Sequence, residues 1–144
     1  MCILAIGHKM IDDVTPGESW TALNTRPQAQ LVDVRTDAEW MFVGLPDLAG
    51  TGKQVLPISW QALTGQPNPR FVEQLKAAGL TPESEIHFIC RSGARSHSAA
   101  MAARMAGFTH VFNVAGGFEG PPDSHGHRGT VAGWKAEGLP WRQS

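Results

Sequence analysis

The chain has 144 residues, and its 12 lysines and arginines nearly balance its 13 aspartates and glutamates. This length favours one domain over residues 1–144, and the balanced charge argues against a nucleic-acid partner, which requires a basic stripe. A hydrophobic content of 42% supports a packed core and argues against disorder.

The predicted elements alternate between helix and strand along the chain. In chain order they are a helix beginning at Pro16, a strand at 31–34, a helix at 37–43, a strand at 54–58, a helix at 70–78, a strand at 86–89, a helix at 96–105, a strand at 110–114 and a helix at 130–137. Thr15 with Glu18 forms the expected capping box of the first helix, and Asp37 is the expected cap of the second. Such alternation predicts an α/β fold, a parallel sheet with helices on both faces.

Two cysteines occur, Cys2 and Cys90, and they form no CxxC pair for zinc or for a redox disulfide. This usage is typical of a reducing compartment, with Cys90 as the reactive thiol and Cys2 as incidental. The apolar N-terminal run at 1–7 is too short for a signal peptide, and no run is long enough to span a membrane. We therefore expect a cytoplasmic protein without a membrane partner.

The run Cys-Arg-Ser-Gly-Ala-Arg at residues 90–95 lies between the strand at 86–89 and the helix at 96–105. Ligands of parallel sheets bind beyond the carboxyl ends of the strands, and Cys90 lies at such an end. Loop amides and the helix dipole there favour a thiolate, and they would also hold an oxyanion or the outer sulfur of a persulfide. Gly93 provides the tight curvature of the loop because glycine tolerates positive φ.

Four motifs together resemble those of the single-domain rhodaneses, a family of sulfurtransferases. They are Asp33-Val34-Arg35 with Glu39-Trp40, the loop at 90–96, Asn113-Val114-Ala115-Gly116-Gly117, and Trp134 with Gly138-Leu139-Pro140-Trp141. The resemblance implies a rhodanese-like fold, with the active-site loop between a strand end and a helix N-terminus.

Two segments depart from the family pattern. Gly44-Leu45-Pro46-Asp47 stands where the family usually has Gly-His-Ile, so the resemblance does not define the conformation of the turn there. The double glycine and the tryptophan, usually close together, are separated by an inserted loop at about 118–133. That loop forms either a lid or rim near the site or a surface loop. Within it, His125 and His127 lack further ligands, which favours a solvated loop over a metal site.

The resemblance implies sulfur transfer through Cys90 as the catalytic nucleophile. Its thiolate would take the outer sulfur of a small anionic donor such as thiosulfate, and the resulting persulfide would pass that sulfur to cyanide or a thiol, without a metal or other cofactor. The substrate-binding residues expected from the loop are Arg91, Ser92, Gly93, Ala94, Arg95 and Ser96. Arg91 is expected to hold the anion, and Arg95 either does the same or bonds backbone carbonyls to fix the loop.

Asp33 and Arg35 are expected to support the site, mainly structurally, with Glu39 as the partner of Arg35. Two other functions use a similar pocket. A sulfur carrier or interaction module, loaded by a sulfur-relay partner, needs the same thiolate, and the sequence does not separate it from an enzyme. A phosphatase or arsenate reductase is disfavoured, because tyrosine phosphatases have one more residue between the cysteine and the arginine than the four between Cys90 and Arg95.

Overall fold

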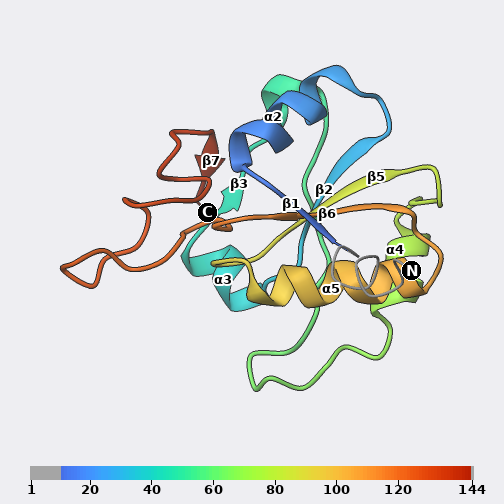
Figure 1. The fold of residues 1–144 in the computed structure, drawn as a ribbon. Coiled ribbons are helices and arrows are strands. Elements are labelled where there is room, and N and C mark those ends of the chain that lie inside the picture. The colour runs from blue at the N-terminus through green and yellow to red at the C-terminus, as the bar shows by residue number, and fades with distance from the viewer. Residues whose placement is uncertain (1–10, 144) are drawn as a thin grey trace, which may run out of the picture.

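The structure is a computed structural model that describes residues 11–143. Its main sheet has five strands in the order β1-β6-β5-β2-β4, and all its strand pairs are parallel (Figure 1). The elements are β1 (Asp12–Val14), α2 (Pro16–Thr25), β2 (Ala29–Asp33), α3 (Asp37–Phe42), β3 (Leu45–Pro46), the 3-10 helix η1 (Ala49–Thr51), β4 (Leu56–Pro57), α4 (Phe71–Ala77), β5 (Glu85–Ile89), α5 (Ala94–Met105), β6 (His110–Val114) and β7 (Trp141–Arg142). None of the helices described over this range is long and apolar enough to cross a membrane.

Helices cover both faces of the sheet, as predicted. Successive strand residues point to opposite faces, so Phe88 and Ile89 belong to two separate core clusters. Phe88 packs in the cluster that contains Leu75 of α4 and Ala103 of α5, whereas Ile89 packs in the cluster that contains Leu23 of α2. The view in Figure 1 shows α2 on one side of the strands and α4 and α5 on the other.

The caps of the first two helices differ in how well the sequence predicted them. Thr15 and Glu18 form the predicted capping box of α2, with each side chain bonded to the other's backbone N–H. For α3 the predicted cap is wrong, because Thr36 rather than Asp37 is the N-cap. Thr36 and Glu39 form a second capping box, which places Asp37 in the first helical turn, where a negative charge also stabilises the helix.

The helix predicted at 130–137 is also wrong. Residues 134–138 form only turns. The N–H of Trp134 donates to the carbonyl of Gly117 at 2.8 Å, and the N–H of Lys135 donates to that of Phe118 at 3.1 Å. In a helix these two amides would donate to the carbonyls of residues 130 and 131, but here they donate to Gly117 and Phe118 instead, so tertiary hydrogen bonds override local propensity.

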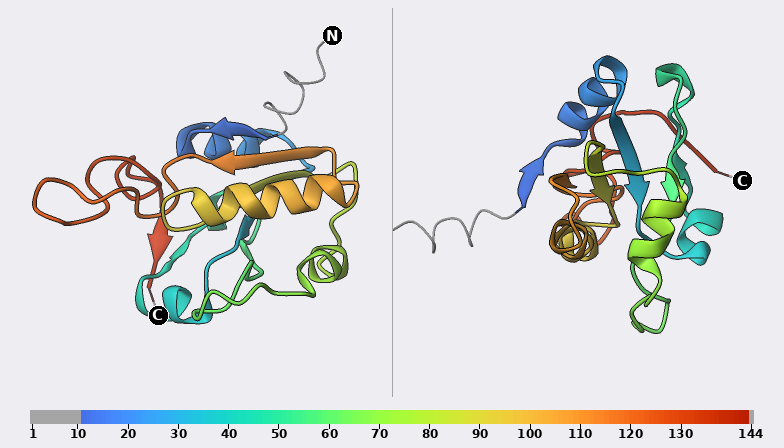
Figure 2. Two further views of the ribbon diagram at one scale, coloured as in Figure 1. Left: turned by 60° about the horizontal axis from the view of Figure 1, so that its bottom comes forward. Right: turned by 90° about the vertical axis from the view of Figure 1, so that its right-hand side faces the viewer.

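The chain departs from the sheet twice at the same end of the molecule. β3 and β7 form a small antiparallel sheet, in which Leu45 and Pro46 pair with Arg142 and Trp141. This pairing defines the conformation at 44–47, which the sequence left undefined. The segment 118–133 extends from the end of the sheet at which α5 begins (Figure 2). We call residues 118–133 the inserted segment.

Candidate active site

The loop of interest joins the carboxyl end of β5 to the start of α5, as predicted. Cys90 directly follows β5, and Gly93 is the N-cap of α5 with φ of 119°, a backbone conformation that glycine adopts without strain. The helix begins at Ala94, two residues earlier than predicted. Arg95 and Ser96 therefore lie in the first helical turn, and only residues 91–93 form the loop.

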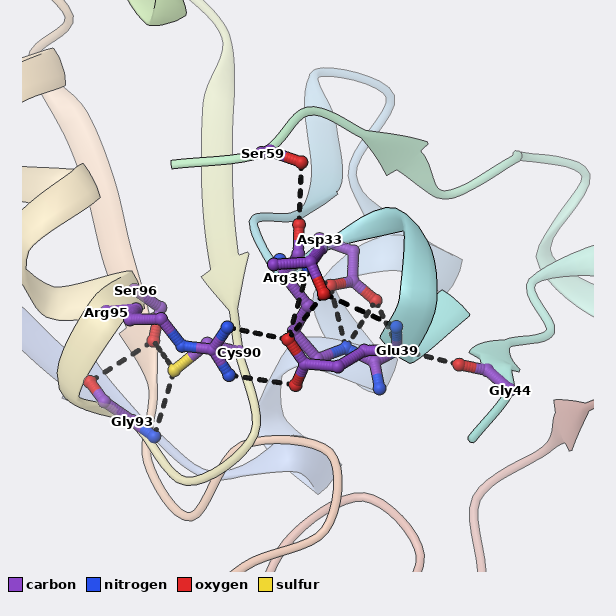
Figure 3. Close-up of polar contacts among 10 residues, drawn as sticks. Asp33, Arg35, Glu39, Gly44, Ser59, Cys90, Gly93, Arg95 and Ser96 are labelled. Carbon is purple, nitrogen blue, oxygen red and sulfur yellow. Dashed lines mark hydrogen bonds and ion pairs between the residues drawn. The ribbon is translucent and has the colours of Figure 1, made fainter. Parts of the chain in front are cut away.

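Two hydrogen-bond donors lie against the sulfur of Cys90 (Figure 3). The backbone N–H of Gly93 lies 3.1 Å from Sγ, and Oγ of Ser96 lies 3.2 Å from it. The residue is only 1% exposed, so the sulfur lies at the base of the loop. The predicted ring of amides thus contributes one N–H to the sulfur among the described residues, and a hydroxyl side chain supplies the second contact.

A polar chain behind the loop controls what the Ser96 hydroxyl can do. Its Oγ lies within hydrogen-bond distance of Cys90 Sγ, the Gly93 carbonyl and Asn113 Oδ1. Asn113 donates its Nδ2 to Asp13 at 3.0 Å, which orients its Oδ1 towards Ser96. Because a hydroxyl has one proton, Ser96 donates to the sulfur only when it releases the other acceptors. Sequence reasoning quoted Asn113 in a motif without giving it a role, and it missed Asp13; the two lie on β6 and β1 and meet because these strands pair.

The charged end of Arg95 is held by Glu39 of α3. Two hydrogen bonds of 2.7 and 2.9 Å join the guanidinium to the two carboxylate oxygens. Burial opposes ionisation of Glu39, but the hydrogen bonds and charge of Arg95 outweigh it and lower the pKa of Glu39 below its usual value. Two expectations are therefore wrong: Arg95 bonds a carboxylate rather than backbone carbonyls, and Glu39 pairs with Arg95 rather than with Arg35.

Asp33 and Arg35 form a fully buried ion pair beside the site. The guanidinium of Arg35 bonds both carboxylate oxygens of Asp33, at 2.7 to 3.2 Å, and the carbonyl of Gly44 at 2.7 Å. It also lies over the ring of Phe118, 4.4 Å from the ring centre. Both side chains are 0% exposed. This placement gives the pair a supporting position between β2, the 44–47 turn and the inserted segment.

The inserted segment is bonded directly to the active-site loop. The N–H of Phe118 donates to the carbonyl of Cys90 at 2.7 Å, and those of Glu119 and Gly120 both donate to the carbonyl of Arg91 at 3.0 Å. Gly117 makes this approach possible, because a Cβ there would lie 2.5 Å from the Cys90 carbonyl oxygen. The backbone of Cys90 and Arg91 is therefore held by a segment that sequence reasoning left open as lid, rim or surface loop.

A cavity of about 400 Å³ opens over the charged side chains of this region. Its charged lining consists of Arg91, Arg95, Arg128, Glu39 and Glu119, and its apolar lining consists of Val43, Ala62 and Leu63. Of the loop residues expected to bind substrate, Arg91 and Arg95 line this cavity, whereas Ser92, Gly93, Ala94 and Ser96 do not. Cys90 also lies outside its lining. Arg128 and Glu119, which sequence reasoning missed, enter the cavity from the inserted segment.

The described residues contain no candidate metal site. Within residues 11–143 no group of three or more histidine, cysteine or acidic side chains is arranged to hold a metal ion. The backbone N–H groups of His125 and His127 both donate to Asp123, which closes the tip of the inserted segment. Cys2 lies outside the described residues.

Comparison with known proteins places this geometry in a family. A family model described as the STR4 middle domain matches residues 13–144. The crystal structure of Rv0390 from M. tuberculosis superposes with a TM-score of 0.85 at 44% identity, covering 94% of this chain and 100% of that one. Rhodanese-like domain-containing protein 4 of Arabidopsis thaliana is 27% identical over 85% of this chain, which corresponds to 24% of that longer protein.

One more solved structure bears on the fold alone. The solution structure of a polysulfide-sulfur transferase homodimer from Wolinella succinogenes has a TM-score of 0.65 and 22% identity, covering 98% of this chain and 86% of that one. The five-stranded parallel sheet with its cysteine loop is thus a rhodanese-like fold, as the motifs predicted. The chain belongs to the rhodanese-like family described as the STR4 middle domain.

Proposed function

We propose that this protein is a sulfurtransferase in which the thiolate of Cys90 accepts a sulfane sulfur as a persulfide and passes it to an acceptor. The observation that carries the proposal is the pair of donors on the sulfur, the Gly93 N–H at 3.1 Å and the Ser96 hydroxyl at 3.2 Å. The Gly93 N–H already points at the sulfur and stabilises negative charge there without reorganisation. The Ser96 hydroxyl adds a second donor once its proton turns to the sulfur from Asn113 Oδ1 or the Gly93 carbonyl. Membership of a rhodanese-like family supports the same conclusion.

The proposed transfer has two covalent steps. The thiolate attacks the outer sulfur of thiosulfate, the S–S bond of the donor breaks, and its bonding pair leaves with sulfite. The negative charge then lies on the outer sulfur of the Cys90 persulfide. A thiophilic acceptor, cyanide or a thiolate, attacks that outer sulfur and returns Cys90 to its thiolate, so no oxidant or cofactor is required.

The state of Arg95 argues against phosphoryl transfer in the same pocket. A phosphatase of this type needs an arginine whose guanidinium is free to donate two hydrogen bonds to the phosphoryl oxygens. Glu39 already occupies both terminal nitrogens of Arg95. This arrangement suits a role in holding the loop, and it leaves Arg91 as the exposed arginine of the loop itself.

The depth of the sulfur limits what can react with it. Because Cys90 is 1% exposed, only the narrow end of a donor or acceptor reaches Sγ. The proposed partners are therefore a small anionic sulfur donor and a thiophilic acceptor, in a reducing cytoplasm that keeps Cys90 free. A sulfur-relay protein is the alternative source, and the experiment below separates the two.

Thiocyanate production tests the proposal. Purified protein mixed with thiosulfate and cyanide is expected to form thiocyanate, and Cys90→Ser is expected to abolish it, while the matched thiol control Cys2→Ser retains it. Full activity of Cys90→Ser would contradict the mechanism. Wild-type protein that accepts sulfur only from a cysteine desulfurase, and not from thiosulfate, would instead identify a relay carrier.

A further inference from the structure

The inserted segment places a second arginine, Arg128, at the cavity beside the active-site loop. Arg128 is half-buried, and its Nη1 donates to the carbonyl of Gly120 at 2.7 Å. Gly120 is itself bonded through its N–H to the carbonyl of Arg91. The position of Arg128 is therefore tied to the loop through two successive hydrogen bonds, and its guanidinium keeps further N–H groups for a ligand.

The charged residues that line the cavity carry a net positive charge. Arg95 and Glu39 neutralise each other through their two hydrogen bonds. Arg91, Arg128 and Glu119 make none of the ion pairs found within residues 11–143. Two arginines and one carboxylate outside those ion pairs thus line the cavity, and this net positive charge favours an anion bound by the arginines.

The volume and lining of the cavity suit a ligand larger than an inorganic ion. Its volume of about 400 Å³ corresponds to roughly a dozen water molecules at about 30 Å³ each, far more than thiosulfate occupies. It lies within the range of sites for small organic molecules, about 300–1,000 Å³. Val43, Ala62 and Leu63 in its lining provide apolar surface that a carbon skeleton can contact.

We propose that Arg128 and Arg91 form an anion subsite that binds a carboxylate on an organic sulfur donor, at a distance from the sulfur that Cys90 receives. This subsite rests on the proposed sulfurtransferase function and names the donor class for it. The carboxylate bridges the two arginines, the carbon skeleton contacts Leu63 and its neighbours, and the narrow sulfur end reaches Cys90. Arg128 is then a specificity-determining residue supplied by the inserted segment.

A matched pair of donors tests the subsite. Benzenethiosulfonate and 4-carboxybenzenethiosulfonate differ only in the remote carboxylate. With either one, the Cys90 thiolate attacks the outer sulfur, the S–S bond breaks, and the arenesulfinate leaves with the bonding pair. We expect the wild-type KM for the carboxylated donor to be about tenfold lower, the effect of a charge-assisted hydrogen bond at a partly exposed site.

Substitution of Arg128 should remove this preference. Arg128→Gln is expected to bring the two KM values together while kcat with the carboxylated donor is retained, and Arg128→Lys should keep part of the preference. As a control, Arg104→Gln at an exposed position of α5 removes the same charge and should keep the full preference for the carboxylated donor. Glu119→Gln removes the opposing carboxylate and should strengthen the preference. A wild-type enzyme without preference, or a preference that survives Arg128→Gln, would overturn the subsite.

Binding without chemistry separates failure of the subsite from failure of the proposed function. Calorimetry on Cys90→Ser with benzenesulfinate and 4-carboxybenzenesulfinate measures the subsite when no sulfur moves. Tighter binding of the carboxylated anion, lost in Cys90→Ser with Arg128→Gln, supports the subsite even if wild-type protein transfers no sulfur. Equal binding of the two anions, with normal sulfur transfer, would overturn the subsite and leave the proposed function intact.

Discussion

Two arginine–carboxylate pairs in this chain have the same shortest contact but differ in burial. Arg35 and Asp33 meet at 2.7 Å with both side chains 0% exposed. Arg95 and Glu39 also meet at 2.7 Å, with side chains 22% and 17% exposed. Since distance is equal, burial decides what each pair does. The interior pair joins three segments of the fold, whereas the rim pair joins the first turn of α5, directly after the active-site loop, to α3.

The difference teaches that contact length is a poor guide to the cost of losing a pair. Removing one member of a buried pair leaves a charge without a partner or water, and this costs about 3–5 kcal/mol. A partly exposed pair loses less, about 0.2–1 kcal/mol, because water replaces the missing partner. We therefore expect the interior pair to govern the free energy of unfolding and the rim pair to govern the reactivity of the loop.

The largest effect should come from the interior pair. Arg35→Met leaves the carboxylate of Asp33 buried and unpaired, so we expect the free energy of unfolding to fall by about 3–5 kcal/mol in urea titrations. Arg70→Met is the matched control, since Arg70 forms an exposed pair with Glu73 at 3.5 Å. A loss for Arg35→Met no larger than for the control would break the comparison between buried and exposed pairs.

A third pair, between His87 and Glu85, sharpens the comparison through pH. Burial lowers the pKa of His87 below its usual 6.5, although Glu85, bonded to Nε2 at 2.6 Å, partly offsets this. Ser19 Oγ lies 2.7 Å from Nδ1, an arrangement that suits the neutral ring. The unfolded chain thus binds a proton at a higher pH than the folded chain, and stability is lost as pH falls below about 6.5.

The size of this pH effect has an upper limit. One proton changes the free energy of unfolding by at most about 1.4 kcal/mol per pH unit. We expect the difference in stability between wild type and His87→Gln, measured from pH 7.5 down to 5.5, to shrink as pH falls. Parallel curves for the two proteins would show that His87 titrates alike in the folded and unfolded states.

The smallest effect on stability should come from the rim pair. Glu39→Gln is expected to cost at most about 1 kcal/mol at neutral pH. Because the pKa of Glu39 is lowered in the fold, the contribution of the carboxylate is present above about 4.5 and is lost as pH falls through the folded pKa. The same variant frees Arg95, so we expect it to slow sulfur loading of Cys90 even though the free energy of unfolding changes little. An unchanged rate of sulfur loading would show that the Arg95–Glu39 pair does not position the loop.

The sequence predicted the elements that depend on local patterns. The strand at 110–114 and the Thr15 capping box agree with the structure, because apolar periodicity and capping residues act over a few positions. The helix at 130–137 failed because the amides of Trp134 and Lys135 are taken by residues far away in the chain. Local signals do not contain such tertiary competition.

The candidate site divides in the same way. The position of Cys90 between β5 and α5 follows from the sequence, as does the positive φ of Gly93 in the loop. The contact of Ser96 with Asn113, and the arrival of Arg128 at the cavity, depend on strand pairing and on the path of the inserted segment. The Arg95–Glu39 pair could have been weighed from the sequence, because both residues belong to motifs on which the resemblance rests.

The most direct test of the central claim is the intact mass of the protein after exposure to thiosulfate. The account predicts a gain of one sulfur atom located on Cys90, lost again on addition of cyanide and absent from Cys90→Ser. A wild-type mass that stays unchanged with thiosulfate and with the organic donors, while Cys90 remains a free thiol, would contradict it.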